Sequence, residues 1–108
     1  MRYGMVIGLH DHMVGEYRRL HAAVWPEVLA VLSANDIRNF SIFLKEPENL
    51  LFGTFDYVGD DYAEAARRID ADPASQRWYR LTETCQKPLG SRGSGEWWAF
   101  MEPVFHLD

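Results

Sequence analysis

The sequence predicts an α+β domain whose elements follow the ferredoxin-like order βαββαβ. Three observations predict it. Two regions with the apolar spacing of helices are flanked by segments with the alternation of strands, and a short turn joins the middle two strand-like segments. No linker, repeat or low-complexity segment divides the chain. With 108 residues, a length that fits one domain, we expect residues 1–108 to fold as a unit.

The first strand is predicted at "RYGMVIGL", residues Arg2–Leu9. Tyr3, Met5 and Ile7 alternate and therefore share one face of a strand. The two glycines of this segment fall on the opposite face, where they leave room for a helix or a ligand to approach.

Helical spacing begins after this strand and continues to residue 36, with Asp11 as the predicted N-cap. Pro26 interrupts the pattern. Proline lacks the backbone donor of a helix and disfavours helical geometry at the preceding residue, Trp25. We therefore expect a kink or two successive helices.

A hairpin is predicted next, with strands at Ile37–Leu44 and Leu50–Val58 around the turn "KEPEN". Residues 59–86 form the second helical region, which "DADP" divides so that Ala74–Thr84 is a separate helix. After a loop rich in glycine, serine and proline, Trp97–Asp108 is predicted as the last strand, and its proline indicates an edge or a bulge.

A four-stranded sheet of this order carries both helical regions on one face. The other face remains apolar and needs a cover; its candidates are Phe40 or Phe43, Phe52 or Phe55, and Phe100. A second copy of the same sheet is the simplest cover. The pattern therefore predicts a homodimer around a shared barrel.

Charge, cysteine content and hydropathy indicate which partners and which cellular compartment to expect. The formal net charge of −5 argues against a nucleic-acid partner, because phosphate binding needs a basic face. The single cysteine, Cys85, allows no internal disulfide, and no apolar run is long enough for a signal peptide or a membrane span. These features predict a cytoplasmic protein without a membrane partner.

The segment "EYRRLHAAVWPE" places Tyr17 and His21 four residues apart, on one face of a helix that Trp25 extends if the proline allows. Histidine titrates near neutral pH and can donate or accept a proton in catalysis. A half-buried structural histidine is the alternative. The pair His10-x-His12 lacks a third metal ligand at a recognisable spacing, and nucleotide-binding motifs are absent, so we expect no metal and no cofactor.

Aromatic residues cluster in three segments, and aromatic faces pack well against the C–H faces of sugars. Most of them must serve the core in a chain with 14% aromatic residues. In "SQRWYR", however, two aromatics share a polar helix, where core packing needs one apolar stripe. Trp25, Trp78 and Tyr79 are therefore candidates to bind a sugar.

These segments together resemble a known family. In order and with similar spacing, the matching segments are "EYRRLHAAVWPEVLAVL", "NFSIFL", "NLLFGTFDY", "QRWYRL" and "VFHLD", which resemble the L-rhamnose mutarotase family over nearly the whole chain. The resemblance implies a dimeric α/β barrel. It also implies an isomerase of carbohydrate metabolism that interconverts the α and β pyranose anomers of a 6-deoxy-hexose without a cofactor.

Site residues follow from the resemblance by position. It implies that His21 is the proton donor and Tyr17 a substrate-binding residue. It implies that Trp78 and Tyr79 line the sugar site, and that Phe40 falls where the family can place a substrate-binding tyrosine.

Three positions depart from the family pattern. Phe40 lacks a hydroxyl, Tyr79 replaces a tryptophan, and Pro103 stands where a glutamate can occur. The first two belong to the part that reads the sugar's hydroxyl groups, so L-fucose is an alternative substrate to L-rhamnose. Glu102 is the neighbouring candidate for a base, although a shift by one residue turns a strand side chain to the other face.

Two further function classes remain open. Small dimeric α/β-barrel monooxygenases and lactone isomerases share the predicted fold, and there His21 would be a haem ligand or a base. A non-catalytic sugar-binding module would bind a deoxy sugar without accelerating anomer exchange.

Overall fold

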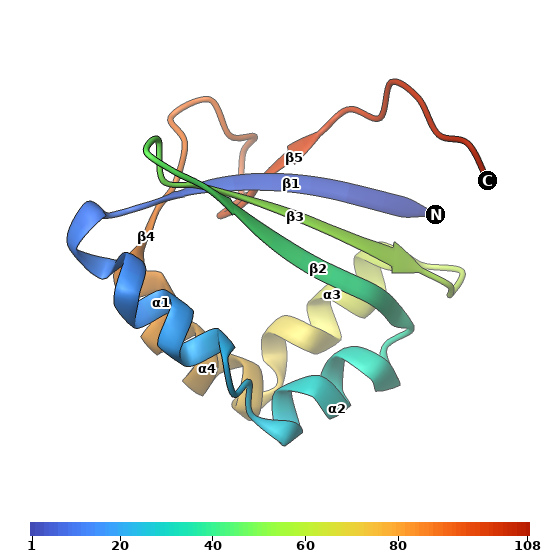
Figure 1. Ribbon diagram of the computed structural model, residues 1–108. Helices are drawn as coiled ribbons and strands as arrows, with labels where there is room; N and C mark the ends of the chain where they lie inside the picture. Colours follow the sequence, from blue (N-terminus) through green and yellow to red (C-terminus); the bar gives the residue numbers. More distant parts are fainter.

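The computed structural model describes residues 1–108, and its elements follow the predicted order. They are β1 (Arg2–Leu9), a 3-10 turn η1 (Asp11–Met13), α1 (Val14–His21), α2 (Pro26–Ala34), β2 (Ile37–Lys45), β3 (Leu50–Tyr57), α3 (Tyr62–Ala71), α4 (Pro73–Cys85), β4 (Gln86–Lys87) and β5 (Ala99–Met101). All four α-helices lie under one face of the curled sheet, and the other face is open (Figure 1). The ferredoxin-like α+β prediction is confirmed.

The sheet is antiparallel, with strand order β2-β3-β1-β4, and β5 also pairs with β1. Along β1 the residues that alternate toward the helices enter two core clusters, one around Ile7 and Leu9 and one around Met5. On β3, Leu51 joins the first cluster and Phe55 the second. The first cluster lies between the sheet and helices α1 and α4, which carry the candidate site residues Tyr17, His21, Trp78 and Tyr79.

Proline and aspartate residues divide both helical regions where the sequence predicts it. Pro26 is the first residue of α2, and the preceding Trp25 is extended, with φ −60° and ψ 134°. Asp72 caps α4 by accepting a hydrogen bond from the Ala74 N–H at 2.9 Å, and Pro73 begins the helix. Each proline occupies a first-turn position where its missing donor costs little.

The prediction for Asp11 was wrong. His10 is the N-cap of the 3-10 turn and makes no side-chain cap bond. The Asp11 carboxylate instead accepts a hydrogen bond from the Asn49 amide at 2.6 Å, which ties the start of the helical region to the start of β3. The Asp11 carboxylate thus bonds a side chain distant in the sequence and not the backbone N–H groups of the turn that follows it.

The predictions for the C-terminal third also need correction. Gln86 and Lys87, expected at the end of a helix and the start of a loop, form β4. A Cβ added to Gly8 would lie 2.8 Å from the Lys87 carbonyl oxygen, so the room beside this glycine admits a strand. The expected strand from residue 97 to 108 is paired only at Ala99–Met101, because residues 102–108 leave the sheet.

The open face of the sheet carries fewer phenylalanines than the sequence suggests. Phe43 and Phe52 alternate onto it and pair with each other across β2 and β3. Phe40 stacks on the buried Phe55 at 5.3 Å between ring centroids, and Phe100 packs edge-on against Tyr3 at 6.1 Å, which places these three on the helix side.

Candidate functional site

Tyr17 and His21 meet on the last turns of α1, as their spacing predicts. Their rings stack with centroids 4.1 Å apart and an angle of 24° between the planes. The His21 Nδ1 lies 3.1 Å from the backbone carbonyl oxygen of Tyr17. Tyr17 is buried at 5% exposure, while His21 is half-buried. The helix itself thus fixes both rings relative to each other.

The hydrogen bond of His21 determines its tautomer. A carbonyl oxygen can only accept, so Nδ1 carries the hydrogen, and in the neutral ring Nε2 holds the free lone pair. Burial lowers the pKa of His21 below its usual value, and the bond to the Tyr17 carbonyl opposes this effect only in part. At neutral pH, Nε2 is therefore ready to accept a proton, and after protonation it can return one.

Two tryptophans support His21 from the core. Trp78 of α4 packs edge-on against the imidazole at 5.3 Å between centroids and is 6% exposed. Trp25, at the break between α1 and α2, packs edge-on against Trp78 at 5.0 Å. The break at Pro26 thus brings Trp25 to Trp78, and the two rings restrict the movement of the histidine.

A pocket of about 340 Å³ opens beside the pair, between α1 and the hairpin of β2 and β3. Its lining is Tyr17, Arg18, His21, Ala22, Ile42, Leu44 and Leu51. The wall from the sheet is aliphatic, whereas the wall from α1 supplies a phenol, an imidazole and a guanidinium. The pocket thus joins hydrogen-bonding groups to apolar surface, as small-molecule sites commonly do.

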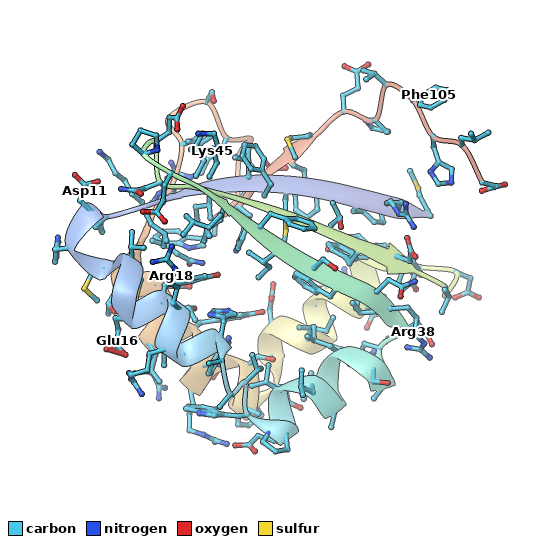
Figure 2. All side chains as sticks on the ribbon, viewed as in Figure 1. Asp11, Glu16, Arg18, Arg38, Lys45 and Phe105 are labelled. Carbon is cyan, nitrogen blue, oxygen red and sulfur yellow. The ribbon has the colours of Figure 1, made fainter.

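Arg18 stands at the mouth of this pocket. It forms an ion pair with Glu46 in the turn between β2 and β3, and both side chains are largely exposed. Figure 2 shows Arg18 on the side of α1 that faces the sheet, with Glu16 on the opposite side. An arginine has five donor hydrogens, so the ion pair leaves donors for a ligand.

The structure places the other predicted residues outside this lining. Phe40 belongs to the aromatic cluster around Phe55, two residues before Ile42 on the same strand. The Tyr79 hydroxyl donates a hydrogen bond to the Asp70 carboxylate at 3.0 Å and so connects α4 to α3. Glu102 is exposed in the unpaired C-terminal segment.

Sequence reasoning missed Arg18 and the three aliphatic residues of the sheet wall. Ile42 and Leu44 could have been found from their alternation on β2, because both fall on the face that meets α1. Arg18 gives no such signal, since nothing in "EYRRLH" distinguishes it from Arg19.

A second hollow, of about 380 Å³, lies at the other end of β1 beside Tyr3, Tyr62 and Phe100. Its two charged side chains already have partners, because Arg2 pairs with Asp56 and the Glu96 carboxylate accepts from the backbone of Gly93. No group of three or more histidine, cysteine, aspartate or glutamate side chains is arranged to hold a metal ion. None of the helices combines the length and apolarity needed to cross a membrane.

Comparison with known proteins identifies the family. A family model described as L-rhamnose mutarotase matches residues 2–107. The chain belongs to the L-rhamnose mutarotase family. It is 32% identical over 80 residues to L-rhamnose mutarotases of Yersinia pestis (strain Pestoides F) and Yersinia pseudotuberculosis serotype O:1b, with 74% of each chain covered.

Solved structures agree on the fold. An L-rhamnose mutarotase from Formosa agariphila superposes with a TM-score of 0.78 at 20% identity, covering 100% of this chain and 99% of that one. A dimeric ferredoxin-like protein from an uncultured marine organism gives a TM-score of 0.61 at 12% identity, with 99% and 95% covered. Membership of the L-rhamnose mutarotase family confirms the expected class, an isomerase that interconverts sugar anomers, and favours it over the monooxygenase and the non-catalytic module.

Proposed function

We propose that this chain interconverts the α and β anomers of L-rhamnose in the pocket beside α1, by general acid–base opening and closing of the ring. The observation that carries the proposal is the stacked pair of Tyr17 and His21 on the wall of that pocket. Its volume of about 340 Å³ lies within the range of about 300–1,000 Å³ typical of small-molecule sites.

The reaction needs two proton movements. A pyranose is a hemiacetal, so ring opening removes a proton from the anomeric hydroxyl, delivers one to the ring oxygen, and breaks the bond between C1 and the ring oxygen. Rotation about C1–C2 of the free aldehyde and reclosure give the other anomer. Positioned acid–base groups contribute about 10²–10⁴-fold to such steps.

His21 is the proposed proton donor, acting at Nε2. The neutral ring accepts the proton of the anomeric hydroxyl, and the resulting imidazolium donates a proton to the ring oxygen as the bond between C1 and that oxygen breaks. Ring closure runs the same two transfers in reverse, so His21 ends each cycle neutral. The tautomer set by the Tyr17 carbonyl supports this role, since it leaves Nε2 for the substrate.

We propose that Tyr17 binds the sugar beside His21. Burial raises the pKa of its phenol, so the hydroxyl stays protonated at physiological pH and is available for hydrogen bonding to a sugar oxygen. Ile42 and Leu44 offer apolar surface for the C6 methyl group and the C–H face of a 6-deoxy sugar, with the buried Leu51 behind them. Trp78 packs against His21 and is itself packed by Trp25. We propose that these two tryptophans also belong to the sugar site, together with Phe40 and Tyr79; the family resemblance assigns Trp78, Tyr79 and Phe40 to the sugar.

Saturation-transfer NMR on the two anomers tests this proposal. Purified protein should accelerate the exchange of L-rhamnose above the buffer rate, and both His21→Ala and Tyr17→Phe should reduce that acceleration. Leu29→Ala is the control, because this leucine is exposed on α2 and lies outside the pocket. Wild-type exchange in both site variants would show that the site is elsewhere.

L-fucose is the second candidate substrate. The absence of a hydroxyl at Phe40 and the tyrosine at position 79 support it, because both changes fall among residues that the family resemblance assigns to reading the sugar. Exchange measured on L-rhamnose and L-fucose at equal concentration decides between them, and a preference for L-fucose would overturn the first assignment.

We further propose that the chain works as a homodimer. The C-terminal segment leaves the domain with Val104, Phe105 and Leu107 at 89%, 83% and 79% exposure, and Phe105 projects into solvent (Figure 2). The open face of the sheet adds Phe43 at 62%. A second copy can bury both surfaces at once. The expectation of a cytoplasmic protein that binds neither nucleic acid nor membrane stays a prediction.

A further inference from the structure

Arg18 is the one permanently charged residue among those that line the pocket beside α1. Its guanidinium donates a hydrogen bond to the carboxylate of Glu46, which lies in the turn between β2 and β3. Glu46 itself does not line the pocket. The ion pair therefore joins the helix and the hairpin that form the two walls of the pocket, and it places a negative charge against the only fixed positive one.

The neighbouring charges are paired in the same way. Lys45 pairs with Glu48 at 3.1 Å within the turn, and Arg19 pairs with Glu16 on α1. Figure 2 shows Arg18 and Lys45 at the same end of the molecule. With the ion pair of Arg18, three cations thus face three carboxylates at this end, and their charges cancel.

An arginine without such a partner attracts anions. Its planar guanidinium binds phosphate or carboxylate through charge-assisted hydrogen bonds, often two in parallel. At Arg18 the protein already supplies a carboxylate, so an anionic ligand would have to displace Glu46 or approach its negative charge. A sugar hydroxyl meets no such barrier, because it can accept from a donor that the ion pair leaves free.

We propose that Glu46 is a specificity-determining residue, which neutralises Arg18 so that the pocket accepts neutral sugars and excludes anionic ones such as sugar phosphates and sugar acids. This inference rests on the proposed function and deepens it, because it specifies the charge of the substrate. Glu46 acts through Arg18 and needs no contact with the sugar.

The variant Glu46→Gln tests this role, since it keeps the shape of the side chain and removes its charge. Two ligands with a locked anomeric centre are compared as inhibitors of L-rhamnose exchange, the anionic α-L-rhamnose 1-phosphate and the neutral methyl α-L-rhamnoside. Relative to the methyl glycoside, the phosphate should inhibit about threefold more tightly, or better, in the variant than in the wild-type protein, as expected for one exposed charge interaction. An unchanged ratio would overturn the proposal.

Two matched variants separate the ion pair from the general loss of negative charge. Glu48→Gln removes the same charge from the same turn, but Glu48 pairs with Lys45, which does not line the pocket, so the ratio should stay at the wild-type value. Adding Arg18→Met to Glu46→Gln should abolish the gain in phosphate binding. A gain that persists without Arg18 would contradict the proposed role of the pair.

A readout without turnover keeps this test separate from the proposed function. Inorganic phosphate is the probe, because it needs no particular orientation of a sugar, and the ¹⁵N resonance of the Arg18 Nε reports its binding. This resonance should shift at lower phosphate concentration in Glu46→Gln than in the wild-type protein, and added sodium chloride should weaken the effect by screening. Equal titrations in the two proteins would overturn the role of Glu46. Absence of exchange by the wild-type protein on any sugar would overturn the proposed function instead.

Discussion

The imidazole of His21 stacks on the phenol of Tyr17 and, through Nδ1, also bonds the backbone carbonyl of the same residue. One residue thus sets both the plane and the tautomer of the histidine. This arrangement needs only the four-residue spacing of a helix. The stability of the protein in acid, the packing around His21 and the affinity for the sugar can each be measured separately.

The stability of the protein should fall in mild acid because of His21. Its pKa is about 6.5 in the unfolded chain and lower in the folded one, so between these two values the unfolded chain binds more protons. Stability is therefore lost as pH falls from about 6.5 through the folded value, whereas above about 6.5 both states are neutral and the effect vanishes. Urea denaturation at several pH values should show a smaller acid loss in His21→Asn. Parallel curves for the two proteins would contradict this account.

Trp78 should be among the most sensitive positions of the core. It is 6% exposed and contacts both His21 and Trp25, so Trp78→Ala leaves a cavity beside α1. Replacement of a buried tryptophan by alanine costs about 3–5 kcal/mol in unfolding free energy. Trp78→Phe should cost less and should lower anomer exchange by loosening His21. A loss under about 1 kcal/mol in Trp78→Ala, measured by denaturant titration, would show that the site collapses without penalty.

Arg18 should affect substrate affinity more than stability. Its ion pair with Glu46 is exposed, and exposed pairs contribute about 0–1 kcal/mol. Arg18→Met should therefore leave unfolding nearly unchanged and raise the KM for the sugar about tenfold, as expected for one lost hydrogen bond. Arg19→Met is the matched control, because Arg19 pairs with Glu16 and does not line the pocket. Equal KM values for the two variants would exclude Arg18 from binding.

Oligomeric state should depend on the C-terminal segment. Phe105→Asp puts a charge on a side chain that is 83% exposed in the single chain, so the variant has little reason to disturb the domain itself. We expect sedimentation velocity to show a dimer for the wild-type protein and a monomer, or a weaker dimer, for the variant. Leu29→Asp introduces the same charge on α2 and should leave the dimer intact. A dimer of unchanged strength in Phe105→Asp would place the interface elsewhere.

The order of elements could be predicted because its signals are local. Alternation and helical spacing need no knowledge of distant residues, and Pro26 and Pro73 divide the helices by their own geometry. Strand β4 could not be predicted in this way, because two residues are too few to show alternation. They form a strand here because Gly8 of β1 has no side chain and lets the backbone at Lys87 approach closely.

The candidate site was predictable only in part. Four-residue spacing indicates that Tyr17 and His21 share a face, and the structure stacks their rings. The direction of Phe40 depends on an irregularity between Arg38 and Ser41, where Asn39 has a φ of 51°. Gln86 bonds Trp97, and Tyr79 bonds Asp70, because the fold brings these side chains together. The spacing of residues along the sequence does not predict such contacts.

The helix that carries Tyr17 and His21 is eight residues long, and isolated helices shorter than about 12–15 residues barely persist in water. The stacked pair of Tyr17 and His21 therefore persists only while packing against α4 and the sheet stabilises this helix. During refolding, the chain must close the long loop between α1 and α4 before the pair is assembled. Recovery of anomer exchange should accordingly follow the slowest packing step of refolding and lag behind the return of helical signal.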